Sequence, residues 1–141
     1  MNVWSRRNRA RGAAGWLGPL EWRVLEALWQ RGTLASVRDL QPMFSDIAYT
    51  TLMTTLDRLY RKGVLARVKQ GRAFVYQPEL SRAEFESARA ADAFRTALEG
   101  GGGSLALSYF VDAVSEQDRR LLDELEALVR ARRAAIAKNR P

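Results

Sequence analysis

Four threonines, Thr50, Thr51, Thr54 and Thr55, stand in the stretch AYTTLMTTLDRLYRKG at residues 48–63. Threonine is a mediocre helix former because its branched Cβ loses rotamer freedom. Its short side chain nevertheless offers a hydroxyl for hydrogen bonds and a methyl group for apolar contact. This pair of groups matches the mixed polar and apolar edges of nucleic-acid bases.

The leucines of the same stretch recur with helical spacing, so the angular position of each residue follows from about 100° per residue. With Leu52 at the centre of the buried face, Thr55 falls near the buried side and is expected at the core edge. The outward residues and their flanks are Tyr49, Thr50, Thr51, Met53, Thr54, Asp57, Arg58 and Arg61. The sequence thus favours a compact reading face over a helix surface that merely tolerates threonine.

Charged residues follow this face toward the end of the helix. Arg58 and Arg61 are expected to contact phosphates, and Asp57 is spaced to pair with Arg61 at i+4. Arg72, at the tip of a following hairpin, is also expected to contact nucleic acid. We interpret Arg67 and Lys69 as ordinary solvated charges.

Aromatic residues in the same region allow a second reading. Tyr60, Phe74 and Tyr76 could stack on the bases of an RNA. Phe74 and Tyr76 alternate as packing residues do, and a two-stranded hairpin is a small platform for bases. We therefore expect these rings to pack within the protein.

The charge of the 141-residue chain is uneven, although its formal sum is +7. Nine basic and five acidic residues lie in 18–78, whereas residues 79–141 hold ten basic and eleven acidic ones. This asymmetry indicates a polyanionic partner for the first half. The chain has no His and no Cys, so we expect no enzyme, no metal site and no cofactor.

The order of expected elements defines the fold class. A helix begins at Pro19 and ends at Gly32, and a short extended piece precedes a short helix capped by Ser36 and Asp39. After a turn at Pro42, Asp46 is expected to cap the threonine helix, which Gly63 ends. A hairpin over 64–78 follows, with a turn at QGR. The prediction is a mainly α protein with a small β-hairpin, an N-terminal winged helix-turn-helix.

The remainder reads as helical. Capping boxes are expected at Ser81–Glu84 and Ser115–Asp118, with a break at GGGGS, residues 100–104, and a short helix at LALSYFVDA. A stripe at near-heptad spacing closes the chain: Leu121, Leu122, Leu125, Leu128 and Val129. Since the winged helix already has a core, we expect this stripe to form a homodimer rather than pack on its own domain.

Three regions result: a flexible basic arm over 1–17, a winged-helix DNA-binding domain over 18–80 and a helical dimerisation region over 81–138. The arm carries Arg6, Arg7, Arg9 and Arg11 without an acid. It either follows DNA or is a solvated tail. Because no apolar run reaches membrane-spanning length, we expect no membrane insertion and a cytoplasmic protein.

The stretches LEWRVLEALW, AYTTLMTTLDRLYRKGVL and KQGRAFVYQP resemble the penicillinase-repressor and methicillin-repressor family of bacterial winged-helix regulators. The likeness runs from about Leu17 to about Lys138. It implies a transcriptional repressor that binds an inverted-repeat operator in double-stranded DNA as a homodimer. By this resemblance Thr50, Thr51 and Thr54 face the operator, and Gly71 and Arg72 belong to the wing.

In antibiotic-responsive members a membrane sensor protease triggers cleavage in the C-terminal region, and the matching bond here is Ser108–Tyr109. The family's usual residue before that bond is Asn. Copper-responsive relatives carry a C-terminal cysteine cluster, which this chain lacks. Two other classes remain to be weighed: a winged helix used as a protein-interaction module, and a hydrolase, which the lack of His, Cys and paired carboxylates disfavours.

Overall fold

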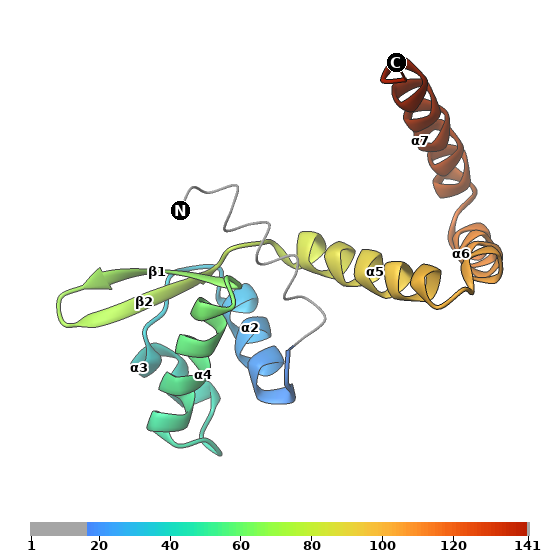
Figure 1. The fold of residues 1–141 in the computed structure, drawn as a ribbon. Helices are drawn as coiled ribbons and strands as arrows, with labels where there is room; N and C mark the ends of the chain where they lie inside the picture. The colour runs from blue at the N-terminus through green and yellow to red at the C-terminus, as the bar shows by residue number, and fades with distance from the viewer. Residues whose placement is uncertain (1–16, 141) are drawn as a thin grey trace. The chain divides into compact units, whose positions relative to one another are not determined.

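The computed structural model describes residues 17–140, which fall into two compact units that meet between residues 93 and 94. The first unit holds α2 (Pro19–Arg31), α3 (Val37–Leu40), η1 (Gln41–Met43), α4 (Tyr49–Arg61), β1 (Leu65–Gln70) and β2 (Ala73–Pro78). Helix α5 (Arg82–Glu99) begins in this unit and ends in the second, which also holds α6 (Gly103–Gln117) and α7 (Arg119–Lys138). Helices followed by a two-stranded hairpin confirm the predicted fold class (Figure 1).

The local signals at the first two helices work as predicted. Helix α2 starts at Pro19 and ends at Arg31, and Gly32 caps it with a φ of 70°, the left-handed conformation that glycine adopts freely. The Ser36 hydroxyl accepts the Asp39 amide at 3.1 Å, and the Asp39 carboxylate accepts the Ser36 amide at 2.9 Å. The predicted capping box of α3 is therefore confirmed.

The prediction that Asp46 caps α4 is wrong. Ala48 is the N-cap residue, and no side chain in the described part of the chain caps it. Asp46 instead accepts two hydrogen bonds from the Arg23 guanidinium on α2, both at 3.2 Å. A bidentate, charge-assisted pair with another helix outcompetes the local cap.

The hairpin pairs β1 with β2 antiparallel, with Arg67 opposite Tyr76 and Gln70 opposite Ala73. Gly71, at the turn, has a φ of 65°. Ala35 forms an isolated antiparallel β-bridge with Tyr76. Its amide donates to the Tyr76 carbonyl at 3.0 Å, and its carbonyl accepts the Tyr76 amide at 2.8 Å. The base of the wing is thereby tied to the segment before α3.

The core of the first unit draws on its α-helices and on both strands of the hairpin. Its fully buried leucines each contribute roughly 1.5–3 kcal/mol relative to exposure. This exceeds the helix-propensity cost of threonine, at most about 0.7 kcal/mol per residue, so the helical state of α4 is secure. The core residues are Val24, Leu25, Ala27, Leu28, Ala35, Val37, Leu40, Phe44, Leu52, Leu56, Leu59, Val64, Leu65, Tyr76, Leu80 and Phe85.

Phe85 shows that this core continues past the hairpin into α5. Its ring lies 5.6 Å from Trp22 and 5.5 Å from Trp29 on α2. The predicted capping box at the start of α5 is present, because Ser81 and Glu84 bond each other's amides. The compact unit extends to residue 93, further than the 18–80 range expected for the winged helix.

The second unit has a different character, because none of its described residues, 94–140, is buried. The predicted Ser115–Asp118 capping box is wrong. Helix α6 continues to Gln117, and the Ser115 hydroxyl donates to the Val111 carbonyl within it at 2.7 Å. Asp118 is itself the N-cap of α7 and accepts the Arg120 amide at 2.9 Å.

Among the described residues, no helix combines the length and apolar character needed to span a membrane.

Candidate nucleic-acid interface

One face of α4 stands out from the winged helix as an exposed edge, which we call the reading edge: Thr50, Thr51 and Thr54. The buried face of the same helix consists of Leu52, Leu56 and Leu59, with Thr55 beside them at 5% exposure. The structure thus confirms the predicted orientation of the helix and the place of Thr55 at the core edge. The expected contacts of the reading edge with DNA stay a prediction.

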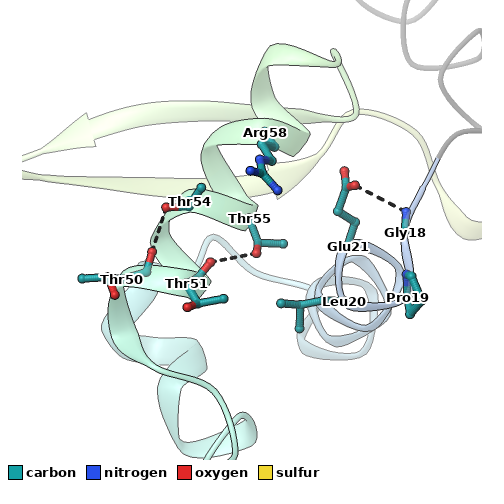
Figure 2. Close-up of a pocket in the computed structure, with 9 residues that line it drawn as sticks. All are labelled: Gly18, Pro19, Leu20, Glu21, Thr50, Thr51, Thr54, Thr55 and Arg58. Carbon is teal, nitrogen blue, oxygen red and sulfur yellow. Dashed lines mark hydrogen bonds between the residues drawn. The ribbon is translucent and has the colours of Figure 1, made fainter.

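Two of the threonine hydroxyls are already engaged within α4. Thr54 Oγ1 donates to the Thr50 carbonyl at 2.9 Å, and Thr55 Oγ1 donates to the Thr51 carbonyl at 2.8 Å (Figure 2). Because its proton is used within the helix, the Thr54 oxygen can only accept a hydrogen bond from a group outside the protein. The Thr54 methyl group lies beside this oxygen. This arrangement suits an amino group on a base edge, or a thymine methyl.

Two hollows lie on either side of α4, and all three threonines of the reading edge line the first of them. The first lies between α4 and the start of α2, and Figure 2 shows its lining: Gly18, Pro19, Leu20, Glu21, Thr50, Thr51, Thr54, Thr55 and Arg58. The second lies between α4, α3 and the wing, and its lining includes Arg38, Tyr49, Met53, Arg72 and Phe74. Helix α4 therefore forms a ridge with a depression on each side.

Unpaired cations line these hollows. Arg58 in the first hollow and Arg38 and Arg72 in the second have no ion pair among the described residues. Their charge is available to an anion from outside the protein. Sequence reasoning named Arg58 and Arg72 but missed Arg38, because nothing in its spacing on the short helix α3 distinguishes it from a solvated charge.

The amino end of α4 adds to the positive potential. The first amides of any helix have no partner within the helix, and the helix dipole places partial positive charge there. Since Asp46 is drawn to Arg23, it does not cover this end. The amino end of α4 is therefore open to an anionic group, beside Tyr49 and Thr50.

Arg61 and Arg67 differ from the unpaired cations. Arg61 Nε lies 2.9 Å from Asp57 Oδ2, which confirms the predicted pair. Arg67 is not the solvated charge that the sequence suggested: its side chain is 22% exposed and its Nη1 lies 3.1 Å from Asp57 Oδ1. Tyr60 and Phe74 pack against its guanidinium, so these rings serve packing, as expected.

The expected dimerisation residues lie together on α7 with their apolar groups largely uncovered. Leu121, Leu128 and Val129 are exposed, whereas Leu122 and Leu125 are half-buried. Ile136 continues the stripe and is 53% exposed. Arginines interrupt the apolar pattern before Ile136, so its spacing alone does not assign it to the stripe.

The expected cleavage position, Ser108–Tyr109, lies inside α6 rather than in a loop, and both residues are exposed. The connection before α6 is glycine-rich, and Gly101 has a φ of 83°. The basic arm with Arg6, Arg7, Arg9 and Arg11 falls almost entirely outside the described residues.

Comparison with known proteins gives a consistent result. Residues 17–130 match the family model described as penicillinase repressor. The chain is 37% identical over 118 residues to the transcriptional regulator BlaI of Mycobacterium tuberculosis. This match covers 79% of this chain and 86% of that protein. It is 25% identical over 111 residues to the methicillin resistance regulatory protein MecI of Staphylococcus aureus, covering 77% and 85%. The chain belongs to the penicillinase repressor family.

Proposed function

We propose that the chain is a transcriptional repressor that binds an inverted-repeat operator in double-stranded DNA as a homodimer. Its relatives are named as a transcriptional regulator and as a methicillin resistance regulatory protein. The proposal therefore places this chain in the control of genes for antibiotic resistance. An alternative is a winged helix that binds another protein.

The observation that carries the proposal is the ridge of α4 between two hollows that hold unpaired arginines. The major groove of B-DNA, about 12 Å wide, admits one α-helix, and the sugar-phosphate strands then pass on either side of it. Arg58 lies on one side of the ridge, and Arg38 and Arg72 lie on the other. Thr50 and Thr54 then face base edges, while the arginines contact phosphates.

A homodimer would explain the second unit. A helix pair that leaves large apolar side chains in water marks an interaction surface, and α6 adds the exposed Leu105, Leu107, Tyr109 and Phe110 to the stripe on α7. A second copy can cover this surface about a two-fold axis. It also makes binding of the second half-site intramolecular, which raises affinity by roughly 10²–10⁴-fold.

Relief of repression would follow from cutting the chain within the second unit, inside α6. Cleavage at Ser108–Tyr109 leaves the winged helix without α7 and hence without its apolar stripe. Because this bond lies in a helix, a protease would need local unwinding of α6. Mass spectrometry of the protein from cells treated with a cell-wall antibiotic should show a fragment ending at Ser108. Intact protein beside induced target genes would exclude this route.

The DNA-binding proposal is tested by a gel shift on the region upstream of the chain's own coding sequence. We expect a shifted complex that survives an excess of unrelated duplex. The triple variant Arg38→Ala, Arg58→Ala, Arg72→Ala should lose binding to both kinds of duplex, because phosphate contacts carry no sequence information. A folded wild-type protein that shifts neither duplex would favour the protein-interaction module.

A further inference from the structure

Arg67, on β1, is a charged residue whose side chain is only 22% exposed. Its guanidinium carbon lies 3.9 Å from the centre of the Tyr60 ring and 4.0 Å from the centre of the Phe74 ring. Tyr60 belongs to α4 and Phe74 to β2, so the flat guanidinium is held between the reading helix and the wing. Such stacking is a property of arginine that lysine does not share.

A carboxylate from α4 completes this arrangement. Asp57 Oδ1 accepts from Arg67 Nη1 at 3.1 Å, and Asp57 Oδ2 lies 2.9 Å from Arg61 Nε. Burial alone would lower the pKa of Arg67, but the neighbouring Tyr76 phenol and the Asp57 carboxylate raise the pKa of Arg67 overall. The residue is therefore fully charged inside a half-buried, hydrogen-bonded setting.

The outer part of the wing, residues 68–74, has few side-chain contacts with the rest of the protein. Residues 68–74 are all exposed, including Val68 at 57%, and a two-stranded hairpin is marginally stable without packing. Tyr76 and Val75 anchor the base of β2 in the protein. Arg67 is paired with Tyr76 across the ladder, and it is the last residue of β1 that is not exposed.

We propose that Arg67 is a positioning residue, which fixes the wing tip and its Arg72 relative to the reading edge by bridging Tyr60, Asp57 and Phe74. This inference rests on the proposed DNA binding. Arg67 acts on DNA through Arg72 rather than by touching DNA itself. Its removal should therefore matter only while Arg72 is present to make its contact.

The test is a double-mutant cycle in the full chain, with the upstream duplex as the probe. Arg67→Met keeps a long apolar side chain but removes the flat charged group. Arg67→Met and Arg72→Ala should each weaken binding roughly tenfold, the scale of one charge-assisted contact. The double variant should be little worse than either alone. The negative slope of log affinity on log salt should become shallower by about 0.9 in each single variant. It should become no shallower than that in the double variant.

Three controls separate this role from others. Lys69→Met likewise replaces a basic side chain by methionine, two positions along β1, at a side chain that lines neither hollow. It should not be coupled to Arg72. Arg67→Lys keeps the charge but has no flat face, so it should behave like Arg67→Met. Full binding by Arg67→Lys would mean that charge alone matters and would overturn the proposal. So would strictly additive losses in the cycle.

A measurement without DNA distinguishes failure of this inference from failure of the proposed function. Amide hydrogen exchange across residues 68–74 should speed up in Arg67→Met and Arg67→Lys, but not in Lys69→Met, while the core amides of α4 stay protected. Unchanged exchange at the wing would refute the positioning role even if DNA binding is established. Faster exchange in a protein that binds no duplex would uphold the bridge and reject the function.

Discussion

Thr54 presents two chemically distinct groups to DNA in the proposed complex, and each can be removed by a separate substitution. Its hydroxyl proton is directed at the Thr50 carbonyl, 2.9 Å away, so toward DNA it offers an acceptor oxygen and a methyl group. Valine keeps the methyl shape without the oxygen, and serine keeps the oxygen without the methyl. The pair of variants separates two modes of reading that an alanine substitution would merge.

We therefore expect Thr54→Val to weaken specific binding by roughly 1–3 kcal/mol if the oxygen accepts from a base amino group, and Thr54→Ser to do so if the methyl contacts thymine. Binding to an unrelated duplex should stay unchanged in both. Fluorescence anisotropy with the two kinds of duplex provides the measurement. Wild-type specific affinity in both variants would show that Thr54 does not contact a base.

Arg58 differs from Arg61 in its availability, since Arg61 is engaged by Asp57 and Arg58 has no ion pair among the described residues. Arg58→Ala should weaken specific and non-specific binding alike and lower the salt slope by about 0.9. Arg61→Ala should lower it less, because part of the charge of Arg61 is already compensated. Equal slopes for both variants would contradict this ranking.

At the scale of elements, the signals that were predicted correctly are local ones. The capping boxes at Ser36–Asp39 and Ser81–Glu84 need only residues three apart, and both form. The equally local Ser115–Asp118 box does not form, because α6 continues through Ser115 to Gln117. Asp46 failed as a cap because Arg23, distant in sequence, binds its carboxylate. The prediction that Arg67 is a solvated charge is wrong for the same reason. Its partners lie on α4 and across the hairpin, and the spacing of residues along one strand does not predict such contacts.

The pairs of Asp39 and Asp46 make a prediction for acid stability. Hydrogen bonds from the Ser36 backbone and hydroxyl hold the pKa of Asp39 below its usual 3.8. Hydrogen bonds from Arg23 likewise lower the pKa of Asp46. A carboxyl with a lowered folded-state pKa contributes stability above its unfolded pKa and loses it as the pH falls.

Asp46→Asn should therefore lower the thermal midpoint at neutral pH by a small amount, since the pair is exposed. The difference from wild type should shrink below about pH 4, as the wild-type carboxylate becomes protonated. Thermal unfolding followed by circular dichroism over this range is the measurement. A difference that grows on acidification would have the wrong sign for this account.

At the scale of the whole molecule, the two units differ in how far they bury their apolar residues. The first encloses a continuous core, whereas residues 94–140 enclose none. The sequence anticipated the stripe on α7 through its spacing. The exposed apolar surface of α6 could not be predicted in the same way, because its residues do not follow one helical stripe. These exposed residues are Leu105, Leu107, Tyr109 and Phe110.

Substitution at the exposed part of the stripe tests the dimer without disturbing the single chain. Leu121 and Leu128 are 46% and 62% exposed, so Leu121→Asp with Leu128→Asp costs little within one protomer but places charge in a dimer interface. The variant should sediment as a monomer and keep only half-site affinity. Ala127→Asp, on the opposite side of α7 by helical spacing, is the matched control and should remain dimeric.

If the double variant sediments as a dimer, the interface lies elsewhere, and α6 is the next surface to test. Phe110, at 47% exposure, is the position of choice there. A monomer with full operator affinity would instead separate dimerisation from DNA binding and contradict the proposed use of the second unit.

The central claim is that a dimer reads two copies of one DNA sequence with the amino-terminal half of α4. Selection of the wild-type protein on a pool of random duplexes tests it most directly. The account predicts enrichment of an inverted repeat whose half-sites are separated by about one helical turn, 10–10.5 base pairs, or a multiple of it. Selection that yields no enriched sequence, or a single site without a repeat, would contradict it.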